Sequence, residues 1–416
     1  MRGSSWRLLA VLALAAALRL IAARVVGEAH VPWAYEHEAI AENVVTRGVY
    51  AFSFYDLSQT KPTSFQPPVY PLFLAATMAA DPEGSFALKA LQILVATLSV
   101  WMLFKLVKAI GWPSEVGLLA AFMMAVYPPL VGYAVLSSPV TLETLFLLAA
   151  MLLVFEARNR NSPWYAIGAG ICLGLSSMTR SPWILSVPLV MAWLAWNSAD
   201  GGRRRFLLPI ILGAAALATM LPWGLRNARI HGSFSLAGTN GGLNFWIGNN
   251  PQATGEYVFP SSLDRDLVLQ AAGLPEPERD RFFYRQGLEF IRREPEKALE
   301  LAARKLGYFL LFRPSMGSSY AQADLPVDLA RSLYQLSWLI LLPVAILGLA
   351  LNRMRWKDHL LLLSIFASQA LVAAAFFAGT RFRTPLEPFF LIWAAAALLH
   401  FSRPILARFY RAAGHA

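Results

Sequence analysis

The sequence predicts an all-α polytopic membrane protein, a bundle of roughly ten transmembrane helices with external amphipathic helices and two long external loops. Of its 416 residues, 57% are hydrophobic and only 15% are charged, whereas about a quarter of the residues in a soluble protein are charged. Several apolar runs approach or exceed the ~18 residues that span a bilayer. The basic residues behind the net charge of +11 cluster at the ends of these runs. These basic clusters recur after every second apolar run. This spacing follows the positive-inside pattern and argues against nucleic-acid binding.

The predicted spans alternate across the membrane and keep the basic clusters and both termini in the cytoplasm. The first run begins like a signal peptide, but Arg19 and Arg24 interrupt it, so we expect an uncleaved first helix. Two later runs are short and meet at a tight external turn, 179–182, so we expect them to be buried in the bundle. The ten windows are 8–26, 86–110, 116–133, 138–156, 164–179, 182–197, 207–225, 333–351, 359–378 and 385–401.

Two long external segments divide the chain into three regions. Residues 1–225 form an N-terminal transmembrane module that includes the first external, catalytic loop at 27–85. Residues 226–332 form an external loop with amphipathic helices. Residues 333–416 form a C-terminal transmembrane module with a basic cytoplasmic tail.

The external loops contain helices of their own. Residues 36–47 have a helical composition, with Gly48 as a C-cap. The run 70–80 is apolar but too short to cross a bilayer, so we place it in the membrane interface. The second loop opens with glycine-rich turns and then becomes helical, and Pro295 begins its second amphipathic helix.

Three glutamates on the external side are candidate catalytic groups. Glu36 and Glu38 follow the first span, where a carboxylate is suited to take a proton from an acceptor hydroxyl. Their spacing places them on different faces of a helix, so they do not form a matched pair. The alternative is that both are solvated residues at a helix N-terminus. Glu143 lies near the external end of an apolar run, which indicates either function or a pair with an arginine.

Arginines on the external side run against the positive-inside pattern and need another explanation. A guanidinium group suits a lipid phosphate because it offers a bidentate fork. The alternatives are snorkelling towards the headgroups and salt bridges to glutamates, namely Glu36, Glu38 or Glu387. The predicted lipid-phosphate-binding set is Arg180, Arg226, Arg381 and Arg383.

The candidates for substrate binding lie mostly in the glycine-rich stretch NGGLNFWIGNNP. Trp246 and Asn249 suit a sugar face and its hydroxyl groups, and the alternative is an ordinary compact loop. Asn244 and Tyr70 complete the predicted substrate-binding set. Two isolated loop histidines are expected at the surface, His37 and His231.

The residue types of a metal site or a disulfide framework are scarce. The chain has one cysteine and six histidines, and their spacing matches neither a CxxC motif nor a zinc cluster. We therefore expect no metal and no cofactor.

A series of motifs resembles a known family. The series begins with an external acidic residue in E-x-x-x-I-A and continues with P-T-x-x-x-P-P-x-Y-P. It extends over nearly the whole chain in SSPVTLETLFLL, SMTRSPWIL, PWGLRNARIHGSF, NGGLNFWIGNNPQATGEY and TRFRTPLEPFFLIWAA. The sequence thus resembles the GT-C superfamily of integral membrane glycosyltransferases. Within it, the match is to the bacterial branch similar to protein O-mannosyltransferases and the lipid A aminoarabinose transferase.

The resemblance implies a polyprenyl-phosphate-linked sugar donor, an inverting and metal-independent transfer, and a lipid, glycan or protein acceptor in a periplasmic cavity. It implies a location in the bacterial inner membrane. The family's catalytic acidic residue falls on Glu36, and the neighbouring Glu38 leaves the choice of base between these two. The alternatives are a polytopic flippase or transporter of lipid-linked sugars and an inactive glycan-binding scaffold.

Overall fold

The structure is a computed structural model that describes residues 2–27, 35–53, 61–82, 85–198, 201–311 and 327–413. Helices and their connecting turns account for nearly all of these residues. Within the described ranges, the β interaction recorded is an isolated bridge between Ala51 and Pro62. The prediction of an all-α protein is confirmed.

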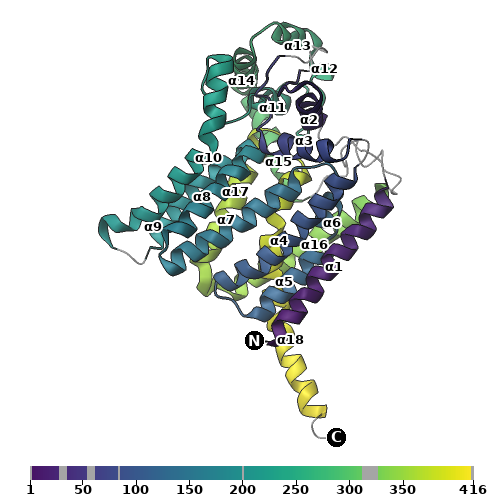
Figure 1. The fold of residues 1–416 in the computed structure, drawn as a ribbon, viewed down its shortest axis with the longest axis vertical. Helices are drawn as coiled ribbons and strands as arrows, with labels where there is room; N and C mark the ends of the chain where they lie inside the picture. Colours follow the sequence, from purple (N-terminus) through teal and green to yellow (C-terminus); the bar gives the residue numbers. More distant parts are fainter. Residues whose placement is uncertain are drawn as a thin grey trace.

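Seven helices of the described part are long and apolar enough to cross a membrane. They form most of the bundle in Figure 1, and the start of the first and the end of the last lie at the same end of it. The protein is therefore a multi-pass membrane protein. These helices are α1 (Arg2–Val26), α4 (Phe86–Ala109), α7 (Val140–Arg160), α10 (Leu207–His231), α16 (Val327–Leu351), α17 (Trp356–Ala375) and α18 (Glu387–Ala413).

One predicted span is divided into two short helices. α5 (Ser114–Val126) stops before a Pro-Pro pair, and α6 (Pro128–Tyr133) begins there. Proline has no N–H, so Pro129 cannot donate to the Ala125 carbonyl four residues earlier. Arg19 of α1 replaces this bond, because its buried Nη1 donates to the Ala125 oxygen at 3.1 Å. The arginine that interrupts the first apolar run therefore compensates for a helix break in a neighbouring element.

The predicted turn between two short apolar runs is confirmed. α8 (Pro163–Thr179) ends before Arg180, which has an extended backbone. η1 (Ser181–Leu185) then leads into α9 (Ser186–Trp196). Both runs are shorter than the ~20 residues of a typical transmembrane helix.

Two glycines on α8 allow α10 to approach closely. A Cβ added at Gly170 would lie 2.3 Å from the Leu212 carbonyl oxygen, and one at Gly174 would lie 2.7 Å from the Thr219 Cβ. Small residues four apart bring helix backbones together in the same way in many membrane proteins. Either glycine therefore has no room for a side chain unless the two helices separate.

A cap of shorter helices covers the end of the bundle opposite the chain termini (Figure 1). The helix predicted at 36–47 and its C-cap are confirmed. α2 ends at Arg47, and Gly48 adopts a left-handed φ of +68° directly after it. The predicted start at Pro295 is also confirmed. The short helices are α2 (Tyr35–Arg47), α3 (Val69–Ala80), α11 (Gly241–Gly248), α12 (Pro260–Leu263), α13 (Arg265–Ala272), α14 (Glu276–Arg293) and α15 (Pro295–Leu310).

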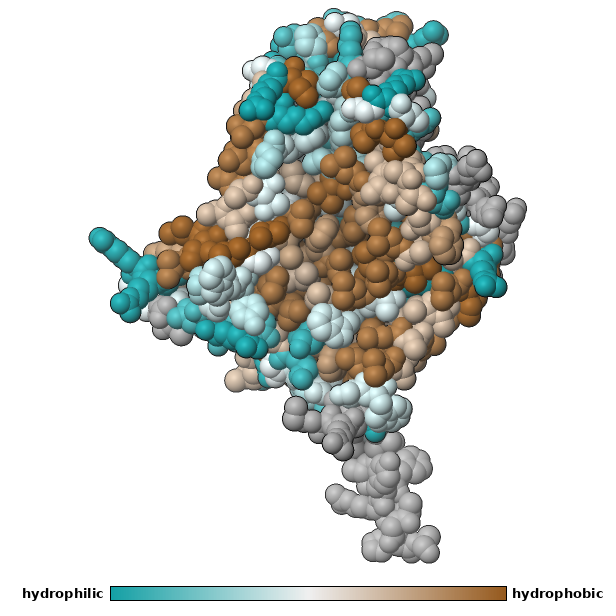
Figure 2. Space-filling model, in the orientation of Figure 1, coloured by the Kyte–Doolittle hydropathy of each residue, from teal (hydrophilic) through white to brown (hydrophobic). Residues whose placement is uncertain are grey.

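The surface and the burial pattern locate the centre of the molecule. Figure 2 shows hydrophobic side chains across the bundle and hydrophilic ones over the cap and towards the opposite end. In α7 and α18, 78% of the most apolar window is buried, against 17% in α1. α7 and α18 are therefore central and α1 is peripheral, so groups at the cap end of α7 lie deep beneath the cap.

Candidate active site

Segments that are distant in the sequence supply one group of charges where the cap meets the bundle. The first turn of α2 carries Glu36, and the first turn of α7 carries Glu143. Arg180 follows α8, and Arg381 lies in η5 (Thr380–Phe382). The charge of Arg381 acts on both carboxyl groups. We call these four residues the site cluster.

Glu143 is held in place by two partners. Its side chain is 1% exposed. The Trp183 indole N–H donates to Oε2 at 2.8 Å, and Arg180 Nη1 lies 3.7 Å from the same oxygen. The other oxygen, Oε1, has no hydrogen-bond partner among the residues described. The pair with an arginine that the sequence suggested is therefore present, and it leaves one acceptor of the carboxylate unused.

One aromatic ring orients both cations of the site cluster. The Arg180 guanidinium lies 3.7 Å from the centroid of the Phe382 ring, and the Arg381 guanidinium lies 5.3 Å from it. Cation–π attraction favours these positions. Two positive groups held on one ring form a local site for an anion, and guanidinium groups match the geometry of phosphate oxygens.

Glu36 and Glu38 have different surroundings, as their spacing on a helix predicts. Burial raises the pKa of Glu36, and a hydrogen bond from its own backbone N–H together with the charge of Arg381 partly opposes this rise. Glu38 is buried, with 8% of its surface exposed, and its charge acts on Tyr70. A carboxylate with a raised pKa is a stronger proton acceptor, so Glu36 is suited to general base catalysis.

His37 is buried, and the expectation that it lies at the surface is wrong. Its ring lies edge-on to the Tyr70 ring, with 5.2 Å between centroids. Burial, and then the charges of Arg381 and Arg180, lower the pKa of His37 to about 3, so the imidazole is neutral at pH 7. Its Nδ1 has no hydrogen-bond partner within the described residues. The signal was available in the sequence, because His37 shares a helix face with Ile40 at a spacing of three.

Tyr70, the predicted substrate-binding residue of the first loop, lies beside this imidazole. Tyr70 is fully buried at the start of α3, and its hydroxyl lies 3.4 Å from the Ser137 Oγ. Its ring therefore forms part of the wall around His37 rather than an exposed platform.

Arg383 is committed to a structural pair, so its predicted place in the phosphate-binding set does not match the structure. Its side chain is fully buried, and Nε donates to Glu387 Oε1 at 2.8 Å. Nη1 donates to the Phe309 carbonyl at 2.7 Å, at the end of α15. The physical reason is that the positive charge satisfies a buried carboxylate and a helix C-terminus. The salt bridge to Glu387 is one of the alternatives that the sequence left open.

Arg226 also lies outside the site cluster. Its guanidinium packs over the rings of Tyr50 and Trp223, at 5.0 and 4.5 Å from their centroids. Nη1 donates to the Thr63 carbonyl at 3.0 Å. The predicted phosphate-binding role does not match this position, since the cation fixes the segment that leads into α3.

The glycine-rich stretch forms α11 and the turn after it, and it packs inwards. Trp246 is 4% exposed, and its ring lies 5.2 Å from that of Phe283. Asn249 is also 4% exposed and donates to the Ala375 carbonyl at 2.7 Å. The expectation of an open sugar-binding face at Trp246 and Asn249 does not match this burial. Asn244 remains partly exposed on α11.

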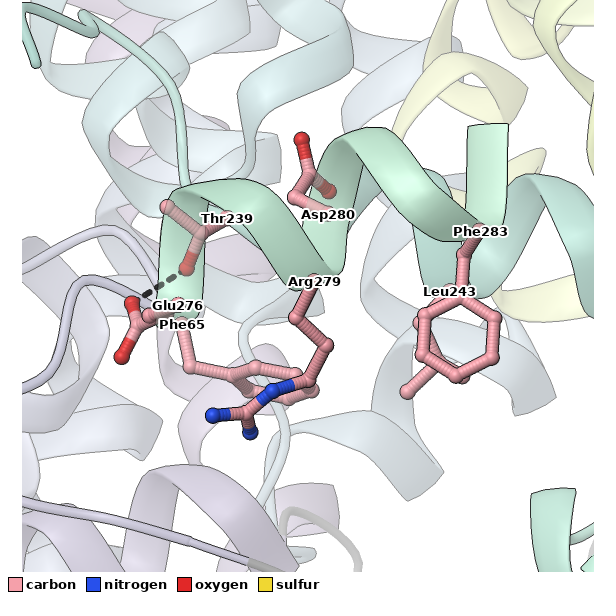
Figure 3. Close-up of a pocket in the computed structure, with 7 residues that line it drawn as sticks. All are labelled: Phe65, Thr239, Leu243, Glu276, Arg279, Asp280 and Phe283. Carbon is pink, nitrogen blue, oxygen red and sulfur yellow. Dashed lines mark hydrogen bonds between the residues drawn. The ribbon is translucent and has the colours of Figure 1, made fainter. Parts of the chain in front are cut away.

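A small depression lies in the cap at the start of α14 (Figure 3). The Thr239 hydroxyl donates to Glu276 there, and Asp280 lies one turn further along the helix. Burial raises the pKa of Asp280 to about 6, which the Gly242 N–H opposes by donating to it at 2.6 Å. The lining contains no member of the site cluster. It consists of Phe65, Thr239, Leu243, Glu276, Arg279, Asp280 and Phe283.

The site cluster has the groups needed for proton transfer and for stabilising negative charge. The Glu36 carboxyl group can accept a proton, and the guanidinium groups of Arg180 and Arg381 can stabilise a negative charge. Within the described ranges, no three His, Cys, Asp or Glu residues are grouped to hold a metal ion.

Comparison with known proteins gives one family match and several structural matches. Residues 65–225 match the model of the family described as dolichyl-phosphate-mannose-protein mannosyltransferase. This part contains Glu143 and Arg180 and precedes Arg381. No curated protein matches the chain.

The structural matches include structures of the oligosaccharyltransferase of Archaeoglobus fulgidus. Its crystal structure with a tethered acceptor peptide has a TM-score of 0.57 at 15% identity, covering 97% of this chain and 51% of that protein. The complex with zinc and sulfate has a TM-score of 0.58 at 14% identity, covering 97% and 50%. The complex of this enzyme, AglB, with an inhibitory peptide and dolichol-phosphate has a TM-score of 0.56 at 14% identity, covering 98% and 52%.

At identities of 14–15%, these structural matches show the fold alone, and the chain spans about half the length of the proteins that it matches. The family model extends from just before α3 to within α10. Residues 65–225 thus resemble the dolichyl-phosphate-mannose-protein mannosyltransferase family, and the chain shares the fold of the matched part of the archaeal oligosaccharyltransferase.

Proposed function

We propose that the protein is a membrane glycosyltransferase that moves a sugar from a polyprenyl-phosphate donor to an extracytoplasmic lipid, glycan or protein acceptor. One observation carries the proposal. A carboxyl group of raised pKa, Glu36, and two ring-supported guanidinium groups, Arg180 and Arg381, come together beneath the cap. The family match at 65–225 and the dolichol-phosphate in the AglB structure support a lipid-phosphate donor.

In this mechanism Glu36 takes a proton from the acceptor hydroxyl or amine. The acceptor atom forms a bond to the anomeric carbon of the sugar while the bond from that carbon to the phosphate oxygen breaks. A single displacement of this kind inverts the anomeric configuration. Glu38 is the alternative base, and its burial next to Tyr70 makes it the less accessible of the two carboxylates.

Arg180 and Arg381 stabilise the negative charge that develops on the departing lipid phosphate. Glu143 Oε2 lies 3.7 Å from Arg180 Nη1, and the hydrogen bond from Trp183 fixes the orientation of that carboxylate. Because the two guanidinium groups supply the positive charge, we propose that the transfer needs no metal ion.

The active site faces the periplasm of a bacterial inner membrane, and both termini are cytoplasmic. The positive-inside pattern supports this orientation, because basic residues lie in the last turns of α4 and α7 and in the short turns that precede α10 and α17. We also propose that the three regions predicted from the sequence contribute different parts of the active site. The catalytic base and two cap helices come from 1–225, the other cap helices from 226–332, and Arg381 from 333–416.

The test is a transfer assay in membranes that contain the protein and in matched membranes that lack it. A panel of radiolabelled polyprenyl-phosphate sugars is offered, and the label is followed into lipid, glycan and protein fractions. Transfer from one donor that depends on the protein supports the proposal. If the donor only crosses the bilayer of sealed vesicles, the protein is a flippase. If the protein binds polyprenyl phosphate but consumes no donor, it is a scaffold.

A further inference from the structure

The Glu276 carboxylate, at the start of α14, binds donors from two loops. The Thr63 hydroxyl donates to Oε2 and the Ser64 N–H donates to Oε1, both at 2.7 Å. The Thr239 hydroxyl also donates to Oε1. The backbones of the two loops meet directly as well, because the Thr239 N–H donates to the Ser64 carbonyl at 2.9 Å. One carboxylate thus joins the first external loop to the second.

The end of α10 completes this arrangement around the Ser64 hydroxyl. Asn227 donates through Nδ2 to the Ser235 carbonyl at 2.8 Å, which turns its Oδ1 towards Ser64. The Ser64 hydroxyl donates to that oxygen at 2.5 Å. A hydroxyl has one proton, so His231, with Nε2 at 2.9 Å, must donate to the Ser64 oxygen. We call the following residues the loop junction: Thr63, Ser64, Asn227, His231, Thr239 and Glu276.

Both loops continue from the loop junction to residues beside the site cluster. The segment 61–68 leads into α3, where Tyr70 lies against His37. In the second loop, the Gly238 N–H donates to the Ser181 Oγ at 3.1 Å, and Ser181 directly follows Arg180. Gly238 has no room for a side chain, since an added Cβ would lie 2.6 Å from the Phe65 carbonyl oxygen.

We propose that Glu276 is a positioning residue, which joins the two external loops and thereby sets the positions of Tyr70 and Arg180 in the active site. The inference rests on the proposed glycosyltransferase function. Glu276 itself touches neither the site cluster nor the reacting atoms. Loss of Glu276 leaves the two loops joined by fewer hydrogen bonds. Tyr70 and Arg180 are then less well placed for the transition state.

The test compares Glu276→Gln with Glu278→Gln in the purified full-length protein. Glu278 is an exposed neighbour on the same helix and serves as a matched control. Amide hydrogen exchange of 61–68 reports on the loops, and steady-state transfer reports on the reaction. We expect faster exchange in Glu276→Gln and a fall in kcat of about tenfold or more, with the donor KM within about twofold of wild type. Glu276→Asp keeps the charge and should recover part of the kcat.

A milder variant keeps the test decisive if Glu276→Gln folds poorly. Thr239→Val removes one of the three donors and should shift exchange and kcat in the same direction, by less. Unchanged exchange at 61–68, or an equal fall of kcat in Glu278→Gln, would overturn the inference. If the wild type transfers no sugar, the proposed function fails, and the exchange of 61–68 alone then decides whether Glu276 joins the loops.

Discussion

The site cluster and the loop junction are both built around a glutamate, but they use its hydrogen-bonding capacity differently. In the loop junction both oxygens of Glu276 accept hydrogen bonds, from Thr63, Ser64 and Thr239. In the site cluster, Glu143 Oε1 is buried without a partner among the residues described. The Nδ1 atom of the adjacent His37 is in the same state.

The two carboxylates therefore differ in what remains available to a ligand. A buried polar atom without a hydrogen bond costs roughly 1–3 kcal/mol, so each such atom calls for an explanation. The buried pair of Arg383 and Glu387 also leaves Nη2 and Oε2 without a partner among the residues described, so this feature alone does not identify a functional site. The loop junction satisfies its carboxylate and therefore fixes loops. The site cluster leaves acceptors and cations open to a ligand, and we infer that the substrate completes it.

The largest effect is expected from removal of the base. Glu36→Gln keeps the shape of the side chain but cannot accept the acceptor proton, so kcat should fall by about 10²–10⁴-fold. Its melting temperature should equal or slightly exceed that of wild type at pH 7, because burial raises the pKa of Glu36 and the folded state therefore disfavours its charge. Glu42→Gln, an exposed change on the same helix, is the control. Equal transfer by Glu36→Gln and Glu42→Gln would remove Glu36 from the mechanism.

The next effect distinguishes two arginines that the sequence treats alike. Arg383→Leu leaves Glu387 as a buried charge without its partner and should lower the free energy of unfolding by about 3–5 kcal/mol. Arg381→Leu should change stability by about 1 kcal/mol or less, because its side chain is partly exposed, and should lower transfer instead. Thermal unfolding of both variants in detergent measures the contrast. Similar stability losses would contradict the separation of these two roles.

A smaller effect is expected in the pH dependence of transfer. Burial raises the pKa of Glu36 above its ordinary value of 4.5, so kcat/KM should fall as the pH decreases through this raised pKa. His37 has a pKa of about 3 and stays neutral over this range. His37→Gln should therefore leave the midpoint of the acidic limb nearly unchanged. A limb that disappears in His37→Gln would instead identify the imidazole as the titrating base.

The smallest effect is expected from one bond of the loop junction. Thr239→Val removes a single hydroxyl donor to Glu276, while the Thr63 and Ser64 donors remain, and should lower the free energy of unfolding by about 1 kcal/mol. Thermal unfolding of Thr239→Val and of wild type measures this difference in free energy. A loss of unfolding free energy as large as that of Arg383→Leu would show that the loop junction depends on every donor to Glu276.

The sequence predicts elements of this fold well where the signal is local. Apolar length identifies the long spans, and the helix at 36–47 ends at Gly48 as its composition indicates. The break before Pro128 was equally local, but the hydrophobic run across it concealed it. A proline pair within an apolar run therefore predicts a helix break, even where the run is long enough to span a membrane.

The partners of the charged residues depend on contacts that no local pattern contains. Arg381 and Arg383 are two positions apart, yet one enters the site cluster and the other is buried against Glu387. Glu276 binds Thr63 across 213 positions of sequence. Sequence reasoning identified the residue types, and only tertiary packing decides which charge meets which.

The central claim is that the site cluster is open to a lipid phosphate, and equilibrium binding of undecaprenyl phosphate tests it most directly. The purified wild type, Arg381→Leu and Arg229→Leu are titrated in the same detergent, with Arg229 as an arginine at the end of α10 outside the site cluster. We predict binding by wild type and Arg229→Leu, and at least tenfold weaker binding by Arg381→Leu. Equal affinity of all three proteins would contradict the account.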